Sequence, residues 1–345
     1  MPNLIHGGDV YRHPDVLDFS SNMNPFGTPE AVIRAASEAL SSIRNYPDPL
    51  CDELANAIAN HEHTDPSHVI CGNGAAELLF IYAAAHRPKR ALLLAPTFAE
   101  YEQALKSVNC HIDFYLLKKE HGFDIREDLT DRLNPDLDLV VLCNPNNPTG
   151  LLADPEILLE VLRICRLNKI RLLVDECFLD FCVEENRSLI PYLNRFPNLF
   201  ILKAFTKSYA MAGLRLGYGL CSDTAFLEQM HAGMQPWNVS LPAQKAGVAA
   251  LKEQKYLERA VAYITKERTW MKDELQKCGL NVYDGRADYL FFQGPKGLAQ
   301  SLLEKGILIR DCSNYRGLDE GYYRIAIRLH EENMKLLAGL LEVIT

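Results

Sequence analysis

The stretch TKSYAMAGLRLGY, residues 206–218, decides how the rest of this 345-residue sequence is interpreted. It contains Lys207 and, eight residues later, Arg215, with small residues and a glycine between them. A lysine amine can form a Schiff base with an aldehyde, and an arginine can pair with a phosphate through two hydrogen bonds. Pyridoxal 5'-phosphate (PLP) carries both groups, so the stretch predicts a PLP site. Alone the pattern is weak, because such residues are usually surface charges.

Two apolar segments upstream end in polar residues. The segment LVVLCNPNNPTG, residues 139–150, breaks into two Asn-Pro steps, and LLVDECF, residues 172–178, reaches an acid at Asp175. Short apolar runs that end in turn residues predict buried strands. In open α/β sheets, ligands bind outside the carboxyl ends of the strands. The ends of these two strands and Lys207 are therefore predicted to converge on one site.

The hydrophobic pattern predicts an α/β fold with a mainly parallel sheet flanked by helices, because strand-like runs alternate with helical periodicity such as Pro155–Lys169. The predicted strands are Ala91–Ala95, Leu137–Cys143, Leu172–Val174, Leu199–Leu202 and Leu216–Cys221.

After Pro242 the pattern changes to that of a smaller α+β domain. A long amphipathic helix is predicted over Lys255–Cys278, then short strands at Tyr289–Gln293, Gly306–Arg310 and Tyr322–Arg328, and a final helix from about Glu331. The predicted division is an N-terminal arm and part of the small domain over 1–44, a large PLP-binding domain over 45–241, and a linking helix with the small C-terminal domain over 242–345.

Composition narrows the class of partner. The formal net charge is −9, which argues against a nucleic-acid partner because phosphate backbones are bound by basic surfaces. Small anionic substrates remain compatible with this negative net charge, because arginines can bind them locally. No apolar stretch approaches the roughly 20 residues of a membrane helix, and the start MPNLIH lacks a signal peptide's basic and apolar regions. The sequence predicts a cytoplasmic protein with no membrane partner.

Neither the cysteines nor the histidines predict a metal site or a disulfide framework. The ten cysteines are scattered without paired spacing, which favours buried free thiols in a reducing compartment. His61 and His63 lie close together, but no cysteine partner stands at a zinc-like spacing. A solvated helix end is the favoured interpretation of the two histidines, and no metal is expected.

The motifs together resemble a known family. NPNNPTG at 144–150, VDE at 174–176, the stretch at 206–218 and YRIAIR at 323–328 are similar to the class I/II aminotransferase superfamily of fold-type I PLP enzymes. The resemblance runs from about residue 18 to the C-terminus in the family's order. Within the superfamily the chain resembles histidinol-phosphate aminotransferases and, more closely, threonine-phosphate decarboxylases of cobalamin biosynthesis. The closer resemblance depends on HGGD at 6–9, DFSSNMNPFG at 18–27 and RDCSNYRGL at 310–318.

The resemblance and the residue chemistry together assign cofactor contacts. Lys207 is the Schiff-base amine, with a pKa lowered by burial and cationic surroundings. Asp175 favours the protonated pyridine nitrogen, which makes the ring an electron sink, and Asn147 donates to the phenolate oxygen. The cofactor phosphate lies at the start of a helix, where free N–H groups favour an anion. The expected phosphate contacts are Gly74, Ala75, Ala76, Thr206 and Arg215.

Two aromatic residues complete this set. Phe98 matches the aromatic residue that stacks on the cofactor ring, although a plain core phenylalanine is the competing interpretation. Tyr46 matches a tyrosine that reaches the phosphate of the neighbouring subunit's cofactor. The second match implies a homodimer with shared active sites.

Arginines dominate the expected substrate contacts. Arg324 matches the residue that clamps the substrate α-carboxylate, for which lysine would be a poor substitute. Arg316 and Arg328 are candidate ligands of a substrate phosphate, although an exposed salt bridge is the usual explanation for any single arginine. His6 and Asn22 are weaker candidates for the same phosphate.

Two positions depart from the family pattern. Ala204 stands where a serine or threonine usually contacts the cofactor phosphate, and either Thr206 or Lys203 could compensate. Phe178 stands where many aminotransferases have a tyrosine that donates to the phenolate oxygen. One hydrogen-bond donor to that oxygen is therefore expected to be missing.

The residues alone leave the reaction open. The resemblance favours decarboxylation of a small phosphorylated amino acid, L-threonine O-3-phosphate, to (R)-1-amino-2-propanol phosphate and CO2 for the cobalamin nucleotide loop. L-Serine phosphate is a close second substrate, because one methyl changes discrimination by only ~1–3 kcal/mol. The alternatives are a histidinol-phosphate aminotransferase and a non-catalytic PLP-fold regulator. A regulator would carry a DNA-binding segment or lose the lysine, whereas this sequence has Lys207 and no basic extension.

Overall fold

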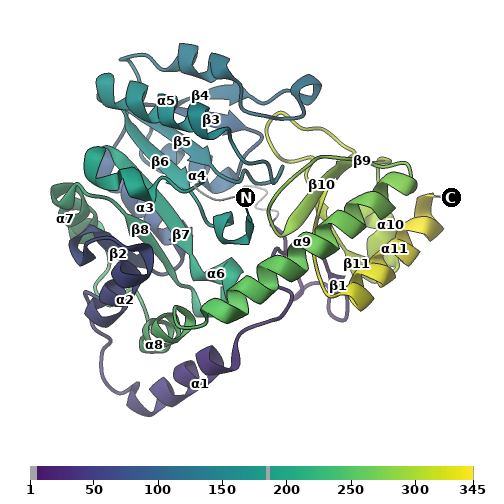
Figure 1. The fold of residues 1–345 in the computed structure, drawn as a ribbon, viewed down its shortest axis with the longest axis horizontal. Coiled ribbons are helices and arrows are strands. Elements are labelled where there is room, and N and C mark those ends of the chain that lie inside the picture. Colours follow the sequence, from purple (N-terminus) through teal and green to yellow (C-terminus); the bar gives the residue numbers. More distant parts are fainter. Residues whose placement is uncertain (1–5, 184–186, 345) are drawn as a thin grey trace.

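Seven strands form the largest sheet of the computed structural model, which describes residues 6–183 and 187–344 (Figure 1). In spatial order they are β2 (Val69–Gly72), β8 (Gly217–Leu220), β7 (Leu199–Ala204), β6 (Arg171–Asp175), β5 (Leu139–Cys143), β3 (Arg90–Ala95) and β4 (His111–Leu116). The five strands from β7 to β4 are parallel, and only β8 runs antiparallel to its neighbours β7 and β2. The predicted mainly parallel α/β sheet is confirmed.

The strands read as continuous apolar runs because both faces of the sheet are covered. Along β5, Val140 and Leu142 enter one hydrophobic cluster, and Leu139 and Val141 enter the other. This alternation is the period of a β-strand. The first cluster includes residues of α2 (Asp52–Glu62), α5 (Pro155–Leu167) and α8 (Leu241–Ala250), and the second includes residues of α3 (Ala75–His86), α4 (Ala99–Ser107) and α7 (Thr224–Gly233).

A smaller region is built on the long helix α9 (Gln254–Lys277), which extends from beside α8 across this region in Figure 1. Its antiparallel sheet has the order β12 (Arg310–Asp311), β13 (Tyr322–Ala326), β10 (Tyr289–Gln293) and β9 (Asn281–Val282). Helices α10 (Leu298–Glu304) and α11 (His330–Ile344) accompany the sheet. The N-terminal arm joins this region through β1 (Leu17–Asp18), which pairs in parallel with β11 (Ile307–Leu308).

The arm also crosses to the large sheet. The Asn24 side chain donates to the Ser208 carbonyl at 2.9 Å, and the Thr28 hydroxyl donates to the Ala210 carbonyl at 2.7 Å. These contacts hold the short helix α6 (Phe205–Ser208), which carries Lys207. The arm therefore connects the two regions beside the predicted lysine.

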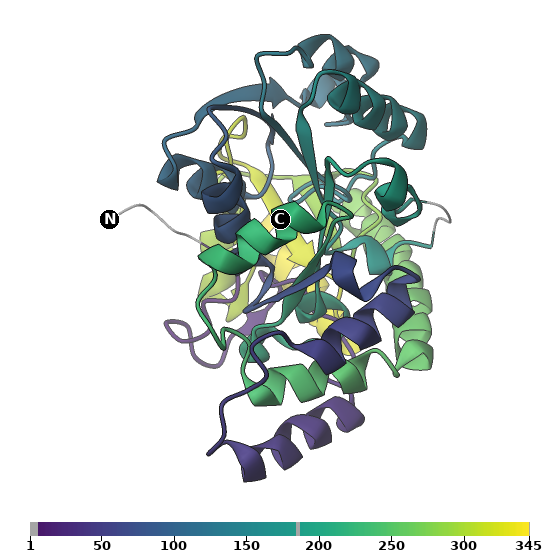
Figure 2. The same ribbon diagram turned by 90° about the vertical axis from the view of Figure 1, so that its left-hand side faces the viewer.

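Helix α1 (Glu30–Ala39) lies at the edge of the molecule, where it contacts α8 (Figure 2). The predicted division at residues 44 and 241 stays a prediction, and residues 1–5, whose sequence was compared with a signal peptide, lie outside the described residues. Within 6–183 and 187–344, none of the helices has the length and apolar character that crossing a membrane requires.

Candidate active site

A cavity of about 660 Å³ lies at the carboxyl ends of β5, β6 and β7 and is completed by the N-terminal arm and the small region. Three residues of the predicted constellation, Asn147, Asp175 and Lys207, line it together. Each follows or ends a parallel strand, so their convergence is a consequence of the sheet's topology. The structure therefore brings the three strand-end motifs to one place.

Lys207 is partly buried on α6 and lies 5.6 Å from the centre of the Phe178 ring. Burial lowers the pKa of its amine, and the charges of Arg324 and Arg215 lower it further, while Asp288 opposes them. The direction agrees with the sequence analysis. A lowered pKa makes the neutral, nucleophilic amine available closer to neutral pH.

Asp175 is buried at the end of β6, and both of its carboxylate oxygens accept hydrogen bonds. The Tyr101 hydroxyl donates to Oδ2 at 2.6 Å, and the backbone N–H of Cys177 donates to Oδ1 at 2.9 Å. Burial raises the pKa of Asp175, and these hydrogen bonds oppose that rise. A carboxylate has about four acceptor positions, so it can still accept from a protonated ring nitrogen. Tyr101 is a partner that the sequence did not reveal.

Asn147 is fixed by residues of the small region. Arg324 Nη1 and the Tyr315 hydroxyl both donate to its Oδ1, the second over 3.4 Å, while Arg324 Nη2 donates to the Ser20 carbonyl at 2.8 Å. Because the amide oxygen is occupied twice, the amide N–H groups are the ones left to donate into the cavity. This orientation is the one that a donor to the cofactor's phenolate oxygen requires.

The start of α3 forms a close-fitting cradle with Arg215. Gly74 precedes the helix with φ +85°, and no side chain caps the first turn. A Cβ at Gly74 would lie 2.6 Å from Arg215 Nη2, and one at Gly217 would lie 2.4 Å from the Ala75 nitrogen. Glycine at both positions therefore lets the guanidinium and strand β8 approach the free N–H groups of the helix. Ala75 and Ala76 line the same wall of the cavity.

Four more of the predicted site residues line the cavity, namely Thr206, Phe98, His6 and Asn22. Phe98 also packs against one core cluster, so it contacts both the cavity and the core. His6 Nε2 lies 3.1 Å from a carboxylate oxygen of Glu100. Asn22 is buried, and its Oδ1 has no hydrogen-bond partner in the described part of the chain.

Tyr46 does not reach this cavity. It is 78% exposed and stacks on Trp237 with ring centres 4.4 Å apart. A residue that contacts a neighbouring subunit's cofactor would have to project outward, so this position is compatible with its predicted role.

The structure does not bring Arg316 and Arg328 to the cavity. Arg316 pairs with Glu102 at 2.8 Å, and Arg328 pairs with Glu332, in the first turn of α11, at 2.7 Å. Neither arginine is among the cavity's lining residues, whereas Arg310 is. The predicted phosphate ligands are thus held by carboxylates outside the cavity. Glu102 lies 214 residues from Arg316, so the local sequence could not show that pair, whereas Glu332 lies only four residues after Arg328.

The two departures from the family pattern are both at the cavity wall. Ala204 and Phe178 line it, and the Phe178 ring packs edge-on against Tyr289 at 5.1 Å. Of the two proposed compensating residues, Lys203 forms ion pairs of 2.9 and 3.0 Å with Glu62 and Asp180 and does not line the cavity. Thr206 is the compensating residue that remains available.

Asp288, which no sequence pattern indicated, is fully buried before β10. Neither of its carboxylate oxygens has a hydrogen-bond partner among the described residues. Burial raises the pKa of Asp288 to about 7, although the charges of Lys207, Arg324 and Arg268 oppose that rise. No strand-end or glycine signal marks this acid; only the folded chain places its charge near Lys207.

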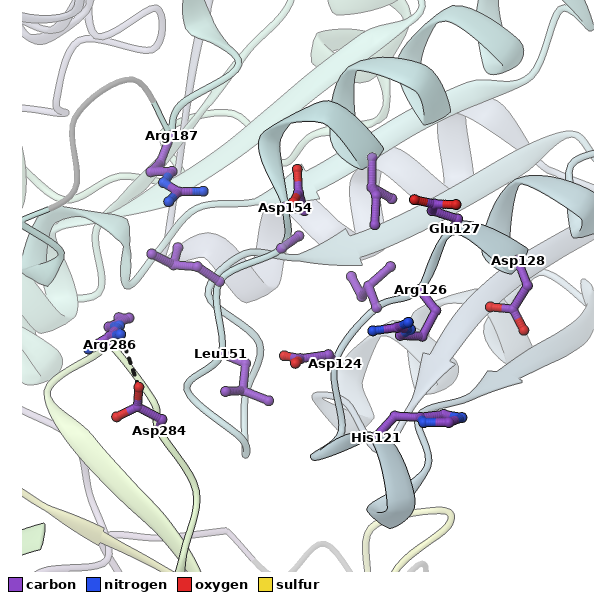
Figure 3. Close-up of a pocket in the computed structure, with 14 residues that line it drawn as sticks. His121, Asp124, Arg126, Glu127, Asp128, Leu151, Asp154, Arg187, Asp284 and Arg286 are labelled. Carbon is purple, nitrogen blue, oxygen red and sulfur yellow. Dashed lines mark ion pairs between the residues drawn. The ribbon is translucent and has the colours of Figure 1, made fainter.

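A second depression of about 780 Å³, shown in Figure 3, lies beside α5 and the 284–286 loop. Its charged side chains have mixed sign, and the acids outnumber the arginines. Asp284 is already paired with Arg286 at 3.0 Å and with Lys272 at 2.6 Å. The depression does not favour an anion and is not the candidate site.

Sequence comparison agrees with this geometry. The pattern described as "Aminotransferase class I and II" matches residues 14–341. The chain belongs to this family. The predicted fold-type I architecture and PLP dependence are confirmed with it.

Individual relatives carry two different names. Threonine-phosphate decarboxylase of Salmonella typhimurium is 39% identical, with 99% of this chain and 97% of the relative covered. The crystal structure of histidinol-phosphate aminotransferase from Clostridium acetobutylicum has a TM-score of 0.89 at 31% identity, covering 94% of this chain and 98% of that one. L-Threonine-O-3-phosphate decarboxylase from Porphyromonas gingivalis has a TM-score of 0.83 at 25% identity, with the same coverage.

The cavity's residues fit PLP. The uncapped first turn of α3 and Arg215 suit its phosphate, the buried Asp175 suits the ring nitrogen, and Lys207 offers an amine of lowered pKa. Asn147 retains its amide donors. The individual contacts with the cofactor remain predictions.

Proposed function

We propose that this protein decarboxylates L-threonine O-3-phosphate to (R)-1-amino-2-propanol phosphate and CO2, a step in forming the cobalamin nucleotide loop, and that L-serine O-phosphate is a second substrate. The observation that carries the proposal is the near full-length identity of 39% with a threonine-phosphate decarboxylase. The cavity supports it, because Arg310 and Arg324 line it together with Lys207. Two buried guanidinium groups suit a substrate that bears a carboxylate and a phosphate.

When bound, PLP supplies an electron sink for a bond that breaks at the substrate's Cα. The chain's own residues bind and orient the reactants. Arg324 would hold the substrate carboxylate through its guanidinium fork, and Arg310 would attract the phosphate. Lys207 would hold a proton on its amine and deliver it to Cα, a role that a lysine of lowered pKa can perform near neutral pH.

Each cofactor contact would have one function. Arg215 and the first turn of α3 would hold the phosphate as an anchor, and Asn147 would orient the ring through its amide. Asp175 would stabilise a proton on the ring nitrogen, and the Tyr101 hydroxyl would keep that carboxylate in position. Because Phe178 offers no hydroxyl, Asn147 carries more of the hydrogen bonding at the phenolate oxygen.

The test is an assay of the purified PLP-loaded protein with L-threonine phosphate and no keto acid. A decarboxylase releases CO2 over many turnovers in this mixture, and L-serine phosphate should give a slower release of the same kind. A transaminase consumes only one equivalent of the amino acid per active site, and it resumes only when 2-oxoglutarate is added. Absence of sustained CO2 release from either phosphorylated amino acid would overturn the proposal.

Histidinol-phosphate aminotransferase is the second candidate, favoured by the TM-score of 0.89 with the Clostridium acetobutylicum enzyme. Histidinol phosphate with 2-oxoglutarate is therefore the control reaction. Sustained glutamate formation there, without CO2 from threonine phosphate, would promote the aminotransferase. A non-catalytic regulator is disfavoured, because Lys207 lies in the cavity with its pKa lowered.

The proposal includes a homodimer with shared sites and a cytoplasmic location. Large apolar side chains are exposed on and after α1, namely Ile33, Leu40, Ile43, Tyr46 and Leu50. Exposed apolar side chains gathered on one segment are typical of a protein interface. Sedimentation of the holoenzyme tests the dimer; a monomer at micromolar concentration would contradict it.

A further inference from the structure

The segment between β12 and β13, residues 312–321, connects the small region to the large sheet. Its tight turns are set by backbone hydrogen bonds from Tyr315 to Cys312 and from Leu318 to Tyr315, both of 3.0 Å. Two side chains of this loop reach residues of the large region: Tyr315 donates to Asn147, and Arg316 donates to Glu102. The loop therefore spans the two halves of the active-site cavity.

The Arg316 contact is shaped as a clamp. Its Nη2 and Nε donate to the two carboxylate oxygens of Glu102 at 2.8 and 3.3 Å. Its guanidinium carbon also lies 4.1 Å from the centre of the Phe114 ring on β4. A two-pronged ion pair combined with an aromatic platform fixes an arginine more firmly than a simple surface pair does.

The Glu102 carboxylate is held in place and charged before Arg316 contacts it. It lies on α4, and Lys106 pairs with its Oε1 at 2.6 Å from one turn further along the helix. Burial raises its pKa, but the hydrogen bonds from Arg316 and Lys106 outweigh burial and lower it overall. The carboxylate is therefore charged at neutral pH, as the clamp requires.

The clamped loop contacts or contains residues that line the cavity, namely Arg310 and Tyr315. Arg310 Nη2 donates to the Asn314 side-chain oxygen at 2.7 Å, and the Arg310 guanidinium lies 5.1 Å from the Tyr315 ring centre. The Tyr315 hydroxyl reaches the same Asn147 oxygen that Arg324 occupies. Undocking the loop would release support from Arg310 and from the Asn147 oxygen that Arg324 contacts at the same time.

We infer that Arg316 is a positioning residue: its clamp on Glu102 and Phe114 docks the 312–318 loop and thereby sets the affinity for phosphorylated amino acids. The inference rests on the proposed function for the substrate class. It replaces the direct phosphate contact expected from the sequence, because Arg316 faces Glu102 and lies outside the cavity lining. The clamp would act on affinity because the substrate binds only the docked form. The apparent affinity falls in proportion to the fraction of protein in that form.

Two single variants separate the roles of clamp and ligand. Arg316→Ala should raise KM for threonine phosphate about tenfold, equal to about 1.4 kcal/mol, with kcat within about twofold because saturating substrate restores docking. Glu102→Gln should do the same, although Glu102 itself cannot bind a phosphate. If Arg316 were instead a direct ligand, removing its acid partner would leave KM unchanged or lower it.

A charge reversal and a matched control sharpen the test. Arg316→Glu combined with Glu102→Lys should recover part of the affinity, because it restores the ion pair but not the contact with the Phe114 ring and places a second lysine beside Lys106. A direct phosphate ligand could not be replaced by an acid. Lys106→Ala removes an ion pair from the same carboxylate without touching the loop, so its KM should stay within about twofold of wild type. An unchanged KM for Glu102→Gln, or no recovery in the reversed pair, would overturn the inference.

Hydrogen exchange keeps this test independent of the substrate's identity. The peptide covering residues 312–318 should exchange faster in Arg316→Ala and Glu102→Gln than in wild type or Lys106→Ala, with no substrate present. If exchange changes as expected but threonine phosphate is not consumed by any variant, the proposed function fails and the clamp stands. If exchange does not change, the clamp fails whatever the substrate is.

Discussion

Two cavity arginines are held by neutral oxygens, whereas two arginines outside the cavity are held by carboxylates. Arg215 donates to the Ala212 carbonyl, and Arg324 donates to the Ser20 carbonyl and the Asn147 amide oxygen. Arg316 and Arg328 donate to the carboxylates of Glu102 and Glu332. Arg215 and Arg324 thus keep their positive charge without a carboxylate partner among the described residues, while Arg316 and Arg328 are neutralised.

The difference shows which arginines have charge available for an anionic ligand. A guanidinium held by neutral oxygens is oriented but not neutralised, so a carboxylate or phosphate gains its full attraction. An arginine already paired with an acid must exchange one anion for another, which gives little net gain. Lys207, whose amine pKa is lowered by burial and by the charges of Arg324 and Arg215, is the first place to test this contrast.

Lys207→Ala should cause the largest loss. Without the amine, the proposed proton transfer at Cα and the proposed covalent hold on the cofactor would both disappear, so activity should fall by at least about a thousandfold. The visible absorbance of bound PLP should be lost as well, and borohydride reduction of wild type followed by peptide mapping should label residue 207. Lys245→Ala, which removes only an exposed ion pair with Glu53, is the control. Labelling of a different lysine would contradict the assignment.

Arg324→Lys should cause the next largest loss, because a lysine cannot bridge Asn147 and Ser20 while also clamping a carboxylate. Losing a buried charged hydrogen bond costs about 2–4 kcal/mol, so kcat/KM should fall roughly 30- to 1000-fold. PLP affinity, measured by absorbance titration of the apoenzyme, should change much less. An equal loss of PLP affinity would mean that Arg324 serves the cofactor and not the substrate.

Lys207 and Arg316 show how far the site could be predicted from the sequence. Asp175 ends one strand of the parallel sheet, and Asn147 and Lys207 follow the ends of its two neighbours, so a local pattern was enough to bring them together. Arg316 could not be assigned in this way, because its partner Glu102 is 214 residues away. Local sequence shows that a charge is present, but only the fold shows whether another segment neutralises it.

The fold follows the same rule. Strand β10 was predicted at its observed bounds, Tyr289–Gln293, because a buried apolar run can be recognised from the local sequence alone. The predicted single strand over Gly306–Arg310 is instead two short strands: β11 pairs with the N-terminal arm, and β12 pairs with β13. Pairing partners that lie far away in sequence decided that split.

Asp288→Asn tests the acid that faces the cavity's positive charges. Burial gives its carboxyl a folded pKa of about 7, above the ordinary 3.8. The folded state then disfavours the charged form, so the penalty is absent below about pH 4, grows with pH and is complete above about pH 7. Relative to wild type, the variant should gain about 2–3 kcal/mol of unfolding free energy between pH 5 and pH 8. Urea denaturation at both pH values measures it, and a gain that does not depend on pH would contradict the assignment.

Arg328→Ala should cause the smallest change, and it decides whether the contrast between the two arginine groups holds. Its partner Glu332 lies four residues later, in the first turn of α11, and the two side chains are 30% and 23% exposed. Pairs of this spacing are worth about 0.3–0.5 kcal/mol, so a small loss of thermal stability is expected. The preference for phosphorylated over unphosphorylated threonine should stay within about twofold of wild type, because the guanidinium is already neutralised and lies outside the cavity lining.

Arg310→Ala, which alters a cavity arginine, should lower the same preference at least about tenfold, as loss of a charge-assisted hydrogen bond implies. If the two variants lose selectivity equally, carboxylate pairing does not remove an arginine from ligand binding, and the phosphate role predicted for Arg328 from the sequence is restored.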